Sequence, residues 1–307
     1  MSTGKLAGRV AIITGAGGGL GAECARVLAE HGASVAVADI NGTAAEAVAE
    51  SLRAAGSQAM GIRTDVSSED EVCDLIAQVK ERFGRIDVLH NNAAVLDGEQ
   101  RQRDRDLANL DMAAFDRAIA VNLRGAVLCT KHVIPLMLEQ GRGSIIFATS
   151  GLGVQGDMSL SGYATSKAAL LMLPKLVAAQ YGKQGIRGNA VQIGLAPQHP
   201  LPEALLDIML DNHCTPALGT PRQIADVVAF LASDESAFVT GSTLVADGGF
   251  GSHTPRWWRC ASCSSRWAAT ACEPGMPASG GVTRRGAFRW TPRGRLRGAG
   301  HSPRVRR

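Results

Sequence analysis

Hydrophobic positions in the first 250 residues follow two periods that alternate along the chain. Short runs rich in β-branched and other apolar residues predict strands, at 9–14, 34–38, 58–64, 86–90, 143–149, 186–192 and 244–246. Between these runs, apolar residues return every three or four positions and predict helices, at 22–31, 44–55, 68–83, 115–135, from 163 onward and from 221 onward. This alternation favours an α/β fold with a doubly wound parallel sheet.

A glycine-rich loop, 14–21, follows the first predicted strand and leads directly into a helix. In such a loop glycines let the backbone approach a pyrophosphate, and the helix N-terminus supplies N–H groups. Asp39 ends the second strand, 18 residues beyond Gly21. An acid there can accept hydrogen bonds from both ribose hydroxyls and repels a 2′-phosphate. The sequence therefore predicts a cofactor site that prefers NAD to NADP.

Polar residues also follow the third and fourth predicted strands. Asp65 and Val66 come after the third strand, and Asn92 and Ala93 after the fourth. Carboxyl ends of parallel strands are where such sheets bind ligands. Asp65 is consistent either with a hydrogen bond to an adenine amino group or with a cap for the helix that begins near residue 68.

Four residues carry the candidate chemistry. Tyr163 and Lys167 are four apart on a predicted helix, so they should share one helix face. A neighbouring ammonium favours the phenolate, so we expect Lys167 to lower the pKa of Tyr163. Ser150 ends the fifth strand, where its hydroxyl can bind a substrate oxygen. Asn122 lies on an otherwise apolar helix face, which indicates either a structural hydrogen-bond network or part of a proton path.

Two connecting segments are expected near these residues. Residues 94–112 are polar and of mixed charge, which predicts a solvated surface loop. Residues 195–218 contain three prolines and a short amphipathic piece, which predicts a flexible lid over the catalytic end. The apolar side chains of this lid, with Leu152, Val154 and Met158, favour a hydrophobic substrate; packing of the lid alone explains them equally well.

Composition divides the chain near residue 251. The chain has 307 residues and 45% hydrophobic content, enough for a large core. Residues 251–307 hold 12 of the 32 basic residues, all Arg, all four Trp, and one of the 28 acidic residues. We therefore predict a domain at 1–250 and a disordered basic tail at 251–307, the latter a genuine appendage or an out-of-frame extension.

Two functional interpretations of the tail compete with disorder. Arg with interleaved Trp is typical of nucleic-acid binding, although we expect no such partner. Cys260-x-x-Cys263, together with Cys272 and His253, is a candidate metal site, but the second closely spaced pair of a zinc site is absent, so no metal is predicted.

The location of the protein is inferred from what the sequence lacks. No stretch reaches the roughly 18 uninterrupted apolar residues of a membrane-spanning helix. The N-terminus shows no apolar core of a signal peptide. We therefore expect a cytoplasmic protein with reduced cysteines and no membrane partner.

Taken in order, these motifs resemble those of the short-chain dehydrogenase/reductase family. The matching positions span about 6–250 and include Thr14-Gly15-x-x-x-Gly19-x-Gly21, Asn91-Asn92-Ala93-Ala94, Asn122, Ser150, Tyr163-x-x-x-Lys167 and Ala246-Asp247-Gly248-Gly249. The resemblance implies a single-domain Rossmann fold with seven parallel strands. It also implies a homotetramer or dimer, assembled through the helices that carry Asn122 and Tyr163.

The resemblance assigns a role to each candidate residue. Tyr163 is implied to be the general acid/base, Lys167 to hold the nicotinamide ribose, Ser150 to orient the substrate oxygen, and Asn122 to fix a water that links Lys167 to solvent. The implied cofactor-binding set is Gly15, Gly19, Leu20, Gly21, Asp39, Asp65, Val66, Asn92, Ala93, Tyr163, Lys167, Ile193 and Gly194. At Ile193-Gly194 the family usually has Pro-Gly, so the nicotinamide end departs from the pattern here.

These observations predict an NAD-dependent dehydrogenase that interconverts a hydrophobic secondary alcohol, including cyclic or steroid-like ones, and a ketone. One alternative is an NADPH-dependent 3-oxoacyl reductase, which Asp39 disfavours. Another is a non-catalytic nucleotide-binding or nucleic-acid-binding protein that uses the basic tail. The presence of Ser150, Tyr163 and Lys167 counts against this last hypothesis.

Overall fold

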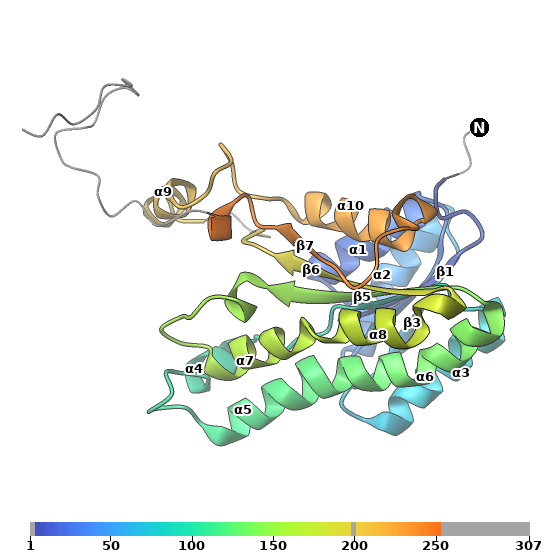
Figure 1. The fold of residues 1–307 in the computed structure, drawn as a ribbon, viewed down its shortest axis with the longest axis horizontal. Coiled ribbons are helices and arrows are strands. Elements are labelled where there is room, and N and C mark those ends of the chain that lie inside the picture. The colour runs from blue at the N-terminus through green and yellow to red at the C-terminus, as the bar shows by residue number, and fades with distance from the viewer. Residues whose placement is uncertain (1–3, 198–200, 253–307) are drawn as a thin grey trace, which may run out of the picture. The chain divides into compact units, whose positions relative to one another are not determined.

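The computed structural model describes residues 4–197 and 201–252, which form one seven-stranded sheet flanked by helices (Figure 1). All neighbouring strands run parallel, in the order β3-β2-β1-β4-β5-β6-β7. The strands are β1 (Val10–Thr14), β2 (Ser34–Asp39), β3 (Ala59–Arg63), β4 (Val88–Asn91), β5 (Gly143–Ser150), β6 (Ile186–Ile193) and β7 (Thr243–Ala246). The predicted doubly wound parallel sheet is confirmed.

Helices cover both faces of the sheet. Their bounds are α1 (Gly19–Glu30), α2 (Gly42–Ala54), α3 (Glu69–Phe83), α4 (Gly98–Arg103), α5 (Met112–Ala118), α6 (Gly125–Gln140), α7 (Ser161–Leu170), α8 (Leu173–Tyr181), α9 (Glu203–Asp211) and α10 (Pro221–Ala232). Helices α1, α2 and α10 pack on one face, whereas α3, α6, α7 and α8 pack on the other (Figure 1).

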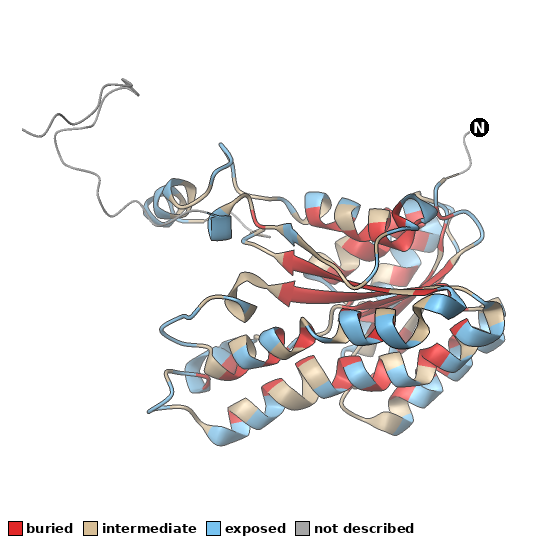
Figure 2. Ribbon diagram, viewed as in Figure 1, coloured by how far each residue is buried: buried red, intermediate tan, exposed pale blue. Residues whose placement is uncertain are grey.

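Each face of the sheet buries its own apolar cluster. Alternate side chains of one strand point to opposite faces, so Val88 and Ile146 join the cluster under α1 and α10, whereas Leu89 and Phe147 join the other. The inner strands are buried along most of their length (Figure 2). Continuous apolar strands of this kind are typical of parallel sheets that are covered on both sides.

The structure differs from the sequence-based expectation at two connections. The polar segment 94–112 contains α4 and two fully buried polar residues, Gln100 and Asp104, so the prediction of a solvated loop is wrong for this part. The single helix predicted at 115–135 consists of α5, a π-helical turn (Ile119–Arg124) and α6. Both differences involve residues that contribute to the candidate site.

Other expectations can be followed only in part. The predicted lid contains α9, but residues 198–200 lie outside the described part. The predicted tail, with its candidate metal ligands, also lies outside it, apart from Gly251 and Ser252. Across 4–197 and 201–252, the helices are too short or too polar to cross a bilayer.

Candidate active site

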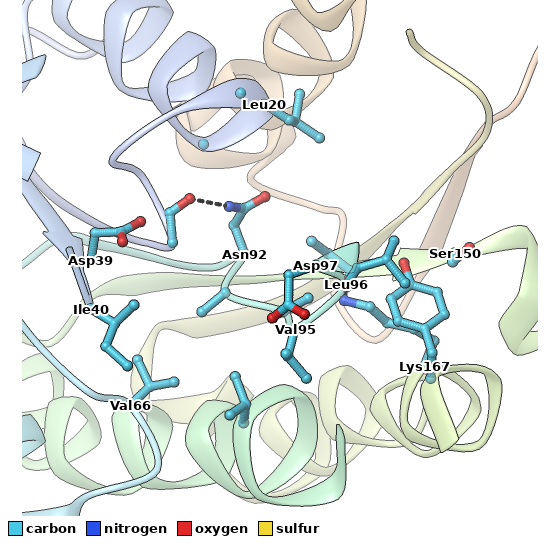
Figure 3. A pocket seen from close by; sticks show the side chains of 18 of the residues that line it. Leu20, Asp39, Ile40, Val66, Asn92, Val95, Leu96, Asp97, Ser150 and Lys167 are labelled. Carbon is cyan, nitrogen blue, oxygen red and sulfur yellow. Dashed lines mark hydrogen bonds between the residues drawn. The ribbon is translucent and has the colours of Figure 1, made fainter. Parts of the chain in front are cut away.

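A cavity of about 600 Å³ opens where the strands end at their carboxyl edge. Asp39, Ile40 and Val66 lie at one end of it, and Leu96, Ser150 and Lys167 at the other (Figure 3). Every residue of the predicted site lines this cavity except Asn122, which lies behind it. Segments that are far apart in the sequence are thus brought to one place, although their roles remain predictions.

The glycine loop is closed by the end of β4. Gly15 has a positive φ of 63°, and a Cβ there would lie 2.7 Å from the Ala93 Cα. A Cβ on Gly21 would lie 2.2 Å from the Gly15 carbonyl oxygen. The Asn92 side-chain amide donates to the carbonyl oxygens of Thr14 and Gly15 at 3.0 and 2.9 Å. Only glycine permits so close an approach, which explains the residue pattern of the loop.

The first turn of α1 is open to the cavity. Its N-cap, Gly18, supplies no side-chain hydrogen bond, and a Cβ on Gly18 would meet no atom within 4 Å. The N–H groups of a helix start attract anions, and the helix dipole adds to that attraction. The loop therefore fits a pyrophosphate, which both candidate dinucleotides carry.

The Asp39 carboxylate lies beside the glycine loop. It accepts hydrogen bonds from the backbone N–H groups of Gly17 and Asn41, both at 2.9 Å. A Cβ on Gly17 would lie 2.9 Å from the Asp39 Cγ, so the carboxylate packs directly on the loop. Each carboxylate oxygen keeps a lone pair for a hydroxyl group. The residues present thus fit an adenosine ribose at this end.

Asp65 does not cap the helix that follows it. The cap of α3 is Ser68, whose side chain accepts from the Glu71 backbone N–H. Asp65 instead accepts from the backbone N–H and the hydroxyl of Ser67, at 2.9 and 2.7 Å. The capping alternative is therefore wrong, and contact with an adenine ring stays a prediction.

Tyr163 and Lys167 lie one turn apart on α7. The Lys167 ammonium is only 3% exposed and donates to the Ala148 carbonyl oxygen at 2.7 Å. It lies 5.5 Å from the centroid of the Tyr163 ring. Ser150, at the end of β5, accepts from the Leu152 N–H at 3.2 Å and also hydrogen-bonds Tyr163. A hydroxyl, a phenol and an ammonium therefore converge on one point of the cavity.

Burial has the largest effect on the pKa values of Tyr163 and Lys167. It raises the pKa of Tyr163 above its ordinary 10.0, and the Ser150 hydrogen bond and the Arg101 charge offset this only in part. Burial also lowers the pKa of Lys167 to about 8. The prediction of a lowered Tyr163 pKa is therefore wrong for this structure, because desolvation of the phenolate outweighs the nearby charges. The Tyr163 phenol is therefore protonated at neutral pH.

Asn122 belongs to a buried network behind the cavity. Its side-chain oxygen accepts from the Val95 N–H at 2.8 Å, and its amide donates to the Ser166 hydroxyl at 2.9 Å. Ser166 in turn donates to the Tyr163 carbonyl oxygen at 2.7 Å. The network joins the loop after β4 to α7. It supports the structural interpretation of Asn122 and leaves the proton path untested.

Asp104 is a residue of the site that the sequence did not reveal. Its carboxylate is fully buried and accepts from the backbone N–H groups of Gly162 and Tyr163 at 2.7 and 2.9 Å. Helix α7 follows Leu160, which has a φ of 60° and provides no side-chain cap. Asp104 therefore caps the helix that carries Tyr163, across a gap in the sequence of 58 residues.

Replacing Asp104 by Ala should loosen the start of α7. Two buried N–H groups would lose their acceptor, so we expect the free energy of unfolding to fall by about 2–4 kcal/mol. Urea unfolding measures this loss, and amide hydrogen exchange at Gly162 and Tyr163 should accelerate. Asp106→Ala is the control, because Asp106 bonds only within its own turn. Equal effects of the two substitutions would contradict the capping role.

The buried ammonium of Lys167 predicts a pH dependence of stability. Lys167 loses its proton near pH 8 in the folded chain, but only near its ordinary value of 10.5 when unfolded. Between these values the unfolded chain binds more protons, so wild-type stability should rise relative to Lys167→Met by about 1.4 kcal/mol per pH unit. Urea unfolding of both proteins from pH 7 to 10 measures it. A difference that does not change with pH would show that Lys167 titrates normally.

Comparisons with known proteins agree with this geometry. A family model described as enoyl-(acyl carrier protein) reductase matches residues 15–251. The cis-4-hydroxycyclohexanecarboxylate dehydrogenase of Sinomonas cyclohexanicum is 39% identical over 245 residues, which cover 79% of this chain and 96% of that protein. The 7α-hydroxysteroid dehydrogenase of Bacteroides fragilis is 36% identical over 251 residues, covering 80% and 96%.

A crystal structure from Burkholderia xenovorans, assigned to the short-chain dehydrogenases/reductases, has the same fold. The two chains align with a TM-score of 0.75 at 34% identity, over 82% of this chain and 99% of the other. The resemblance found in the sequence is therefore confirmed. The chain belongs to the short-chain dehydrogenase/reductase family of oxidoreductases, which use NAD or NADP.

Proposed function

We propose that this protein is an NAD-dependent dehydrogenase that interconverts a hydrophobic secondary alcohol and its ketone, with cyclic alcohols as the substrate class. The observation that carries the proposal is the cavity itself. It holds the Asp39 carboxylate and the glycine loop at one end, and Ser150, Tyr163 and Lys167 at the other. The names of two relatives support the class of cyclic alcohols, because one is named for a hydroxycyclohexanecarboxylate and the other for a hydroxysteroid.

The dinucleotide, when bound, supplies the hydride acceptor or donor. The residues of this chain position the dinucleotide. Helix α1 and the glycine loop hold the pyrophosphate, and Asp39 accepts the adenosine ribose hydroxyls. The carboxylate repels a 2′-phosphate, and the glycine loop carries no Arg or Lys to offset that repulsion. These features together favour NAD over NADP.

At the catalytic end, one proton is transferred between Tyr163 and the substrate oxygen. In the reductive direction Ser150 orients the ketone oxygen and Tyr163, protonated because it is buried, donates its proton to that oxygen. In the oxidative direction the phenolate of Tyr163 takes the proton of the alcohol and becomes the phenol again, and the nearby Lys167 ammonium favours the phenolate that this step requires. Asn122 fixes the loop after β4 against α7, so that the proton donor and the cofactor site keep their spacing.

We also propose that the protein is a homotetramer or dimer whose interface includes α5–α6 and α7–α8. These helices expose apolar side chains at Val127, Met172 and Leu176. Val127 and Leu176 line a hollow of about 150 Å³ between α6 and α8. Residues 1–250 then form the catalytic domain, which the family model matches almost throughout.

Tyr163→Phe tests the proposed chemistry. The substitution removes the hydroxyl and keeps the ring, so oxidation of cyclic secondary alcohols with NAD should fall by at least about a hundredfold. Reduced-nicotinamide absorbance measures turnover, and NADH fluorescence measures cofactor binding, which should persist. If wild type binds NAD but oxidises none of a panel of cyclic alcohols, a non-catalytic nucleotide-binding role is favoured instead.

Asp39→Ala tests the cofactor preference. Loss of the carboxylate removes both the ribose hydrogen bonds and the repulsion of a 2′-phosphate. The ratio of kcat/KM for NAD to that for NADP should therefore fall by about tenfold or more. Glu50→Ala, at an exposed acid on α2, should leave the ratio unchanged. A wild-type preference for NADPH would overturn the assignment and favour a 3-oxoacyl reductase.

A further inference from the structure

Arg101, on α4, is a cation at the catalytic end that has no acidic partner among the described residues. Two neighbouring guanidinium groups are neutralised: Arg103 contacts two carboxylates, and Arg117 pairs with Asp97 at 3.1 Å. Arg101 is exposed, and its Nε donates only to the Leu96 carbonyl oxygen, at 3.1 Å. Four of its five N–H groups are thus left to bind something else.

One hydrogen bond places Arg101 beside the cavity. Leu96, whose carbonyl it contacts, lines the cavity near Ser150 (Figure 3). Asp104 lies directly after α4, and its carboxylate caps α7 at Tyr163. The Arg101 charge is felt at the Tyr163 hydroxyl, where it lowers the pKa against the effect of burial. The guanidinium does not itself line the cavity; it lies beside the lining residue Leu96, and its charge reaches Tyr163.

A free guanidinium beside the cavity selects for a particular ligand chemistry. A carboxylate matches its planar fork with two parallel hydrogen bonds, which a neutral alcohol cannot form. The nearby lining residues Val95 and Leu96 are apolar and suit a hydrocarbon ring. The acid of the same segment, Asp97, already pairs with Arg117, so it does not compete for Arg101.

We propose that Arg101 binds the carboxylate of a cyclic hydroxy acid, so that the preferred substrates carry an anionic group across the ring from the hydroxyl. This inference rests on the proposed function, because it takes Ser150 and Tyr163 as the place where the hydroxyl binds. Arg101 is then the residue that sets specificity, by binding the substrate carboxylate.

Binding of two unreactive ligands tests the role of Arg101 without turnover. Calorimetry with saturating NADH would compare cyclohexanecarboxylate with cyclohexanecarboxamide, which have the same ring and differ in charge. Wild type should prefer the carboxylate by roughly five- to tenfold, as expected for a partly exposed, bidentate ion pair. The preference should disappear in Arg101→Gln, survive in part in Arg101→Lys, and weaken as salt is added. Equal binding of both ligands to wild type would overturn the inference.

Kinetics with the corresponding alcohols completes the experiment. The ratio of kcat/KM for cis-4-hydroxycyclohexanecarboxylate to that for its carboxamide should fall to about one in Arg101→Gln. This ratio cancels any effect of the substitution on Tyr163. Arg105→Gln is the matched control, because Arg105 is exposed in the same segment and makes no ion pair with a described residue. Loss of the ratio in Arg105→Gln as well would show general electrostatic attraction and overturn the inference.

The two proposals can fail separately. If neither alcohol is oxidised but cyclohexanecarboxylate binds in an Arg101-dependent way, the dehydrogenase assignment fails and the carboxylate site stands. If both alcohols are oxidised at equal rates, the dehydrogenase assignment stands and the role of Arg101 is wrong.

Discussion

The hydrogen bond from the Lys167 ammonium to the Ala148 carbonyl oxygen is the contact on which the catalytic end depends. It joins the end of β5 to α7, and so sets the distance between Ser150 and Tyr163. The ammonium is almost fully buried, and it is held by one carbonyl and no carboxylate among the described residues. Keeping it charged at neutral pH costs about 3 kcal/mol, judged from its pKa of about 8. A charge kept at that cost is consistent with a role in function.

Hydrogen bonds between distant segments hold the structure around Lys167 together. The glycine loop is closed by the amide of Asn92, and the loop after β4 is held by Asn122. Helix α7 is capped from α4 by Asp104 and tied to the π-helical turn through Ser166. These bonds are buried or partly buried, and each joins elements that lie far apart in the sequence. These hydrogen bonds hold together the segments that line both ends of the cavity.

Local patterns and the family resemblance were sufficient to predict the sheet, the glycine loop and part of the cavity lining, but not Leu96, Asp97 or Arg117. The hydrophobic period of a strand or helix depends on residues close together in the sequence, and Tyr163 and Lys167 share one helix. Both features can therefore be read from a short stretch of sequence. Asp104 could not be found in this way, because its partners are 58 residues away and its charged neighbours are typical of solvent. The direction of the Tyr163 pKa was also missed, since it depends on burial that a sequence does not display.

The hydrogen bonds between Asp104 and the start of α7 leave the exposed side chains of α4 free of any part in holding that helix. The Asp104 carboxylate caps the start of α7, whereas the side chain of Arg103, in α4, pairs with Glu99 and Asp111. The exposed residues of α4 can therefore change while the capped helix keeps Tyr163 in place. The exposed positions of this segment can accept single substitutions without loss of the cap, provided that the buried Gln100 and Asp104 are retained.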